Sequence, residues 1–124
     1  MAVQFNQPHQ PFDLPIAELS NESVQGLDRY QTGWPVWIRP DSELRDVEFE
    51  TWTRRVYDDE VHHLDRQLGR LLTSLVEAGL DDGTIIAVVS DHGQTLWEHY
   101  GYFEHGGVSH HDELLHVPLI IKPQ

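Results

Sequence analysis

One short stretch of the chain combines residue types that bind metal ions. Asp91 and His92 stand between Ser90 and Gly93, directly after the apolar run 84–89. A strand as apolar as this run is expected to be buried on both faces of a parallel sheet. Ligand sites in such sheets form at the carboxyl ends of the strands, where a glycine lets the backbone turn. A carboxylate oxygen and a neutral imidazole nitrogen both bind divalent cations, so the sequence predicts half of a metal site at this edge.

Further histidines accompany this stretch. His9 lies between prolines near the N-terminus, and His99, His105, His110 and His111 follow Gly93 within twenty positions. A protonated imidazole binds anionic oxygens or gives a proton to a leaving group. The spacing of the four later histidines matches no known zinc pattern. The alternative interpretation is that His99 orders the loop by hydrogen bonding and that His110 and His111 are surface or packing residues. In the same way, Asp91 on its own could be a turn former, with His92 exposed.

The composition excludes several classes of function. The chain has 124 residues, with 21 acidic and 8 basic side chains and a net charge of −13, so nucleic acid is not an expected partner. There is no cysteine, which excludes disulfides, thiolate zinc sites and a cysteine nucleophile within this chain. Lys122 is the only lysine, and an acidic, lysine-poor surface suits either a salt-loving source or an ordinary acidic protein. No apolar run could cross a membrane and no signal-peptide pattern is present, so we expect a cytoplasmic protein.

The elements that position these residues follow in order along the chain. Five prolines make residues 1–40 a loop-rich excursion. Apolar residues at steps of three and four predict a long helix within 41–80, with a bend or break near Asp46 and a C-terminal cap at Gly79. Residues 84–124 then follow the order strand, metal loop, short helix and strand. This succession is typical of an α/β fold.

The order of several motifs resembles a known family. Residues 57–122 resemble the C-terminal part of the sulfatase domain in the alkaline phosphatase superfamily. The matching pieces are the helix 57–72, the strand entry 79–86, Ser90-Asp91-His92-Gly93, Glu98-His99, His105-Gly106 and the segment 112–121. Upstream, residues 7–12 resemble the family's His-x-Pro-aromatic segment.

This resemblance implies a partial doubly wound, alkaline phosphatase-like sheet with one long helix and one short helix. It also implies hydrolysis of sulfuric or phosphoric esters at a divalent metal, with Ca²⁺ expected first and Mg²⁺, Mn²⁺ or Zn²⁺ as alternatives. Carried over by position, Asp91 and His92 are metal ligands. His9 matches the histidine that contacts the oxygens of the ester group. His105 lies near the position where many members hold a basic group against the substrate.

The chain also departs from the family pattern. The first part of the family domain, which carries the nucleophile and the early acidic ligands, has no counterpart here, and no Ser-x-Pro-x-Arg pattern is present. Trp97 stands where relatives often have glycine. We therefore expect residues 1–124 to be a C-terminal fragment that is inactive alone, poorly soluble, and associated with itself or with the missing N-terminal part. The alternatives are a noncatalytic remnant that binds a metal or a partner, and a phosphatase or phosphotransferase of the same superfamily.

Overall fold

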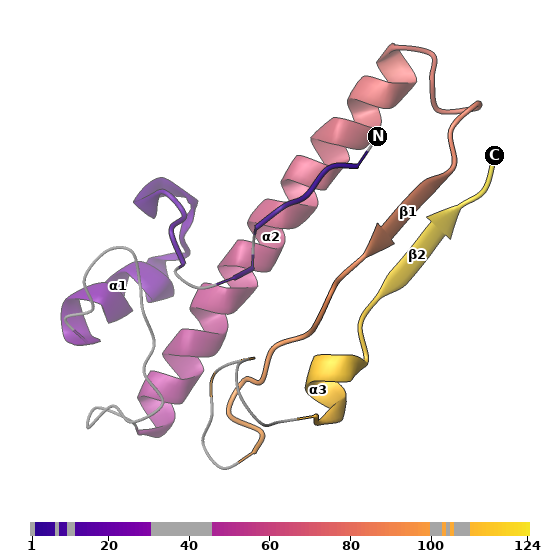
Figure 1. Cartoon of the computed structure of the whole chain (residues 1–124). Coiled ribbons are helices and arrows are strands. Elements are labelled where there is room, and N and C mark those ends of the chain that lie inside the picture. Colours follow the sequence, from indigo (N-terminus) through magenta and orange to yellow (C-terminus); the bar gives the residue numbers. More distant parts are fainter. Residues whose placement is uncertain are drawn as a thin grey trace. The chain divides into compact units, whose positions relative to one another are not determined.

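The structure is a computed structural model and describes residues 2–6, 8–9, 12–30, 46–99, 103, 105 and 110–124. The chain divides into two compact units, residues 1–68 and 69–124. In chain order the described elements are the 3-10 helix η1 (Ile16–Glu18), α1 (Asn21–Tyr30), α2 (Val47–Glu77), β1 (Ile86–Val89), α3 (Asp112–Leu115) and β2 (Leu119–Lys122) (Figure 1). None of the described helices is both long enough and apolar enough to span a lipid bilayer.

In the first unit, α1 forms within the segment that the sequence analysis expected to be loop-rich. The prolines that suggested loops lie before residue 16 and after residue 34, and the stretch between them has none. Ser20 directly precedes the helix, and its Oγ accepts the backbone N–H of Ser23 at 3.3 Å, as an N-cap side chain does. The sequence therefore contains an N-cap residue for α1, although the prolines on either side of this segment suggested a loop.

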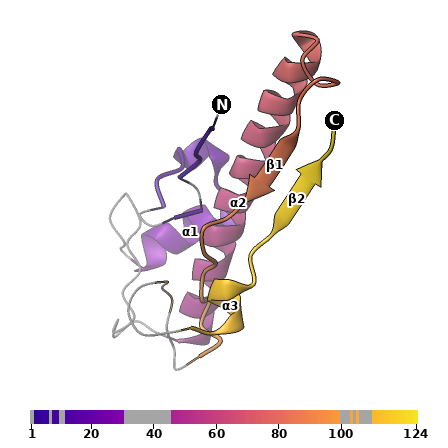
Figure 2. The ribbon, with the colours of Figure 1, turned by 45° about the vertical axis from the view of Figure 1, so that its right-hand side comes forward.

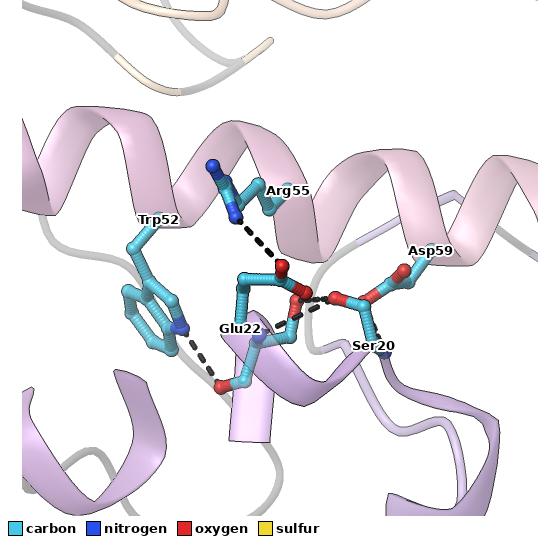
Figure 3. Close-up of polar contacts among 6 residues, drawn as sticks. Ser20, Glu22, Trp52, Arg55 and Asp59 are labelled. Atoms are coloured by element: carbon cyan, nitrogen blue, oxygen red, sulfur yellow. Dashed lines mark hydrogen bonds and ion pairs between the residues drawn. The ribbon is translucent and has the colours of Figure 1, made fainter. Parts of the chain in front are cut away.

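The packing of α1 against α2 depends on aromatic side chains. Tyr30, Phe49 and Trp52 are all buried, and their ring centroids lie 5.1 to 5.8 Å apart. The indole Nε1 of Trp52 donates to the carbonyl oxygen of Ser23 at 2.9 Å, which satisfies the polar atom of a buried ring (Figure 3). These contacts form part of the core of the first unit.

Polar contacts fix the same two helices near the start of α1. The carboxylate Oδ2 of Asp59 accepts both the backbone N–H and the Oγ–H of Ser20, each at 3.0 Å (Figure 3). Arg55 lies 3.8 Å from the carboxylate of Glu22, and both side chains are exposed. Because an exposed ion pair contributes little stability, the buried aromatic rings hold α1 more firmly than the charges do.

The long helix α2 begins and ends at recognisable caps. Asp46 Oδ1 accepts the backbone N–H of Phe49 at 2.8 Å, so the helix starts at Val47, and residues 41–45 of the expected helix lie outside the described residues. Gly79 has a φ of 65° after the last turn, the left-handed conformation expected for its cap. The apolar residues that predict this helix, expected to lie in the core, are not fully buried: Val61 is exposed, and the leucines are half-buried, namely Leu64, Leu68, Leu71, Leu72 and Leu75.

The second unit contains a two-stranded sheet. β1 pairs with β2 in antiparallel register, with Val89 opposite Leu119 and Ile86 opposite Lys122 (Figure 2). The expectation of a parallel strand buried on both faces is wrong for this pair, and Val89 and Leu119 are each 64% exposed. The described part of the connection between the strands contains only the short helix α3, whereas a parallel crossover usually needs a longer helix. The fold is therefore mixed helix and strand, and the doubly wound sheet stays a prediction.

The open end of this sheet is tied to the turn before β1. Lys122 at the end of β2 donates through Nζ to the backbone carbonyl oxygen of Asp81 at 2.6 Å. At the other end, α3 lies beside the residues that leave β1 (Figure 2). The two ends of the sheet therefore differ, because the expected metal ligands Asp91 and His92 lie at the α3 end.

Candidate functional site

Asp91 and His92 lie at the carboxyl end of β1, where the sequence analysis expected a metal site. The carboxylate Oδ1 of Asp91 lies 3.9 Å from Nε2 of His92 and also accepts the backbone N–H of His92 at 3.0 Å. The Asp91 side chain is 86% exposed and that of His92 is 38% exposed. The two donor atoms are therefore close together, and both side chains are accessible from solvent.

The tautomer of the His92 ring follows from a contact between its Nδ1 atom and a backbone carbonyl oxygen. Nδ1 of His92 lies 2.8 Å from the carbonyl oxygen of Gly93. A carbonyl oxygen can only accept a hydrogen bond, so in the neutral ring Nδ1 carries the proton and Nε2 has the lone pair. This is the arrangement in which an outer hydrogen bond orients a metal-binding histidine, and Nε2 is also the nitrogen nearer Asp91.

Gly93 allows α3 to pack directly against this turn. Its backbone N–H donates to the carbonyl oxygen of Leu114 at 2.9 Å. A Cβ atom at this position would lie 1.8 Å from the backbone oxygen of Glu113, which a side chain cannot tolerate. The glycine is thus required by close approach of two backbones, and α3 fixes the turn that carries Asp91 and His92.

His105 lies beside His92. The two imidazole rings are stacked, with centroids 4.3 Å apart and an interplanar angle of 17°. The Oε1 atom of Gln94 lies 3.1 Å from Nδ1 of His105, and the amide nitrogen of Gln94 donates to the carbonyl oxygen of Thr95 at 3.3 Å. With its nitrogen engaged by Thr95, Gln94 presents its acceptor oxygen to His105. Nothing in the sequence links Gln94 to His105, eleven positions later, so no role for Gln94 could be predicted.

His99 is held by a different partner. Its Nε2 atom lies 3.0 and 3.2 Å from the two carboxylate oxygens of Glu113, and its ring stacks on that of His111 with centroids 3.9 Å apart. The pKa of Glu113 is lowered, first by a hydrogen bond from its own backbone N–H and then by the hydrogen bond with His99. His99 thus connects the loop to α3, which corresponds to the loop-ordering interpretation. No zinc cluster of His99, His105, His110 and His111 forms within the described part of the chain.

Three of the four expected site residues lie close together, and their roles stay predictions. Asp91, His92 and His105 belong to the second unit, whereas His9 belongs to the first and is half-buried there. A carboxylate oxygen and an imidazole nitrogen 3.9 Å apart fit a divalent cation as two of its ligands. Among the residues that the structure describes, no third carboxylate or imidazole forms a cluster with both Asp91 and His92.

Comparisons with known proteins agree on one family. The family model described as Sulfatase matches residues 1–123 of the chain. Iduronate 2-sulfatase from Homo sapiens is 32% identical over an alignment that covers 97% of this chain and 26% of the relative. Endo-4-O-sulfatase from Bacteroides thetaiotaomicron is 32% identical over 76% of this chain and 18% of its own length. The multifunctional alkaline phosphatase superfamily protein PehA from Trinickia caryophylli is 35% identical over 56% of this chain and 13% of its own length.

The chain thus spans about a quarter of the length of the iduronate 2-sulfatases it matches. The comparison with solved structures gave no significant match.

Proposed function

Because the chain belongs to the sulfatase family, we propose that it supplies part of the active site of a metal-dependent hydrolase of sulfuric esters. The observation that carries this proposal is the approach of Asp91 Oδ1 to His92 Nε2, 3.9 Å apart at the carboxyl end of β1. Sulfate is favoured over phosphate because the names of two of the relatives are those of sulfatases. A phosphoric ester is the second candidate, since PehA is described as multifunctional within the alkaline phosphatase superfamily.

In this proposal, Asp91 and His92 hold a divalent cation, with Ca²⁺ first and Mg²⁺, Mn²⁺ or Zn²⁺ as alternatives. When bound, such an ion would stabilise negative charge on the ester oxygens and favour the ionised form of an oxygen nucleophile. Asp91 contributes a hard anionic oxygen, and His92 contributes a neutral nitrogen that the Gly93 carbonyl keeps in the correct tautomer. α3 supports both by packing against Gly93.

His105 and His9 are proposed to bind the ester group itself. With Nδ1 of His105 directed to Gln94, the opposite nitrogen, Nε2, is the one that would donate to a sulfate oxygen when the ring is protonated. His9 is assigned to the ester oxygens by its position in the His-x-Pro-aromatic segment. Gln94 is in this scheme a positioning residue, because it orients His105 and does not contact the substrate.

The assignment of Asp91 as a metal ligand predicts that its substitution weakens metal binding, whereas substitution of another acidic residue does not. Asp91→Asn should weaken binding of Ca²⁺ or Mn²⁺ at least about tenfold, because loss of the negative charge of a ligand costs no less than removal of an outer-shell partner. Isothermal titration calorimetry of the purified chain measures this affinity. The matched control is Asp82→Asn, an exposed acid in the turn before β1, which should leave the affinity unchanged. Equal losses in the two variants, or no metal binding at all, would contradict the assignment.

The chain alone is proposed to be inactive. It has no cysteine and no Ser-x-Pro-x-Arg pattern from which a formylglycine nucleophile could be made, and Asp91 and His92 supply only two ligands. We therefore expect no release of nitrophenol from 4-nitrophenyl sulfate or 4-nitrophenyl phosphate in a spectrophotometric assay. Turnover that disappears in Asp91→Ala would overturn this prediction. The partner that would complete the site is the rest of a sulfatase domain, and the alternative is a noncatalytic remnant that retains metal binding.

A further inference from the structure

The first unit contains a buried acid that the proposed function does not use. Glu60 on α2 is 0% exposed, and neither of its carboxyl oxygens has a hydrogen-bond partner. A buried carboxyl without partners is costly, and its ionised form is much more costly than its neutral form. The burial of Glu60 is therefore favoured when its carboxyl group is protonated and disfavoured when it is ionised.

Segment 12–14 packs against α2 where Glu60 lies. Phe12 and Leu14 in this segment are 1% and 2% exposed. The ring of Phe12 meets that of Tyr57, one helical turn before Glu60, edge to face at 6.5 Å. The backbone N–H groups of Asp13 and Leu14 lie near the Glu60 carboxyl and favour its ionised form, although neither completes a hydrogen bond of normal geometry with it.

The charged groups around Glu60 do not compensate an anion. Asp13 on the covering segment and Asp59 on α2 are both acidic. His63, one turn further along α2, lies 3.8 Å from Glu18 of η1 through Nδ1, and Arg66 pairs with that same glutamate. Burial raises the pKa of Glu60 to about 7, with Asp13 and Asp59 adding to the effect and the nearby backbone N–H groups opposing it.

We propose that Glu60 makes the packing of segment 12–14 depend on pH: its neutral form keeps the segment on α2, and its ionised form favours an open state in which water reaches the carboxylate. His9 lies three residues before Phe12 in the chain. On the proposed function, opening of the segment therefore displaces a residue that contacts the ester, and protonation of Glu60 regulates the site.

The direction of the pH effect follows from linkage. In the open state Glu60 has its ordinary pKa of 4.5, and in the closed state its pKa is about 7. The closed state then binds the proton more tightly, so closure is fully favoured below pH 4.5 and loses stability as pH rises to 7. The equilibrium constant for opening should rise by about tenfold per pH unit within this window and level off above it.

Hydrogen exchange tests this inference without metal or substrate. The protection factor of the Leu14 amide, corrected for intrinsic exchange, should fall by about tenfold per pH unit between pH 5 and 7 in the unmodified chain. Glu60→Gln, which cannot ionise, should show a flat profile. Glu77→Gln, the same change at an exposed position on α2, should follow the unmodified chain. A flat profile in the unmodified chain, or a sloping one in Glu60→Gln, would overturn the proposal.

A second measurement covers the case in which Glu60→Gln does not fold. The ¹³C shift of the Glu60 carboxyl in the unmodified chain should titrate near pH 7, together with the exchange of the Leu14 amide. Titration near its ordinary value of 4.5 would refute the inference. Neither readout involves Asp91 or His92, so failure of the metal titration and failure of this test are independent results.

Discussion

Two neighbouring acidic residues on α2, Asp59 and Glu60, have very different surroundings. Asp59 accepts two hydrogen bonds from Ser20, one from its backbone N–H and one from its hydroxyl group (Figure 3). Glu60, the next residue, is fully buried, and neither of its carboxyl oxygens completes a hydrogen bond. Aspartate and glutamate side chains differ by one methylene, so burial and not the residue type accounts for the raised pKa of Glu60.

Trp97 shows strain and packing at a single residue. Its φ of 73° places a bulky side chain in the left-handed region, which costs roughly 1–2 kcal/mol. The same indole is buried and packs on Phe103 with centroids 5.4 Å apart. Burial of a ring this large contributes more than the strain costs, which explains how tryptophan is tolerated at this backbone conformation.

Gly93 provides a test of how strictly α3 fixes the site. Gly93→Ala would place a Cβ 1.8 Å from the backbone oxygen of Glu113, and a backbone atom cannot move aside as a side-chain tip can. We expect a loss of about 1–3 kcal/mol in the free energy of unfolding, measured by urea denaturation, and weaker metal binding. Gly83→Ala is the control, because its Cβ would meet no atom within 4 Å. Equal stability of the two variants would show that α3 does not constrain the turn.

At the scale of elements, the sequence predicted well those segments whose signals are local. Apolar periodicity and a glycine cap located α2, and the apolar run 84–89 located β1 to within two residues of its start. α1 was missed because the flanking prolines outweighed its cap at Ser20. The direction of strand pairing could not be predicted, since an apolar run reads the same for a parallel and an antiparallel neighbour.

The site shows the same division between local and non-local information. Asp91 and His92 are adjacent in sequence, so their proximity at the end of a strand could be predicted. The stacking of His105 on His92 and its bond to Gln94 depend on how the loop returns, which residue types alone do not specify. The burial of Glu60 could not be predicted from its position on the helix, because it depends on contact with segment 12–14, more than forty positions away.

At the scale of the whole molecule, net charge and exposed apolar surface have opposite effects on self-association. Ala87, Val89, Leu119 and Ile121 share one face of the sheet, because directly paired residues point the same way. Val89, Leu119 and Ile121 are 58–64% exposed, an apolar patch of the kind that marks an interface. The net charge of −13 repels a second copy, and this repulsion is weakened by salt.

This balance predicts self-association that increases with ionic strength. Sedimentation velocity should show larger species at about 1 M NaCl than at about 0.01 M, where the Debye lengths are about 3 Å and 30 Å. Ile121→Lys should restore the monomer, because it introduces a charge into the apolar face. Val76→Lys, a matched change at an exposed apolar position on α2, should not. A monomer at every salt concentration, or equal effects of the two variants, would rule out the sheet face as the contact.

The bond between Lys122 and Asp81 has a practical consequence for labelling. Because the chain contains one lysine, an amine-reactive dye has a single side chain to modify, apart from the terminal amine. Lys122 pairs with Ile86, at the opposite end of the sheet from Asp91. A fluorophore attached there would remove the cation that binds the turn and would report fraying of the strand ends, while the chemical groups at the other end stay unmodified.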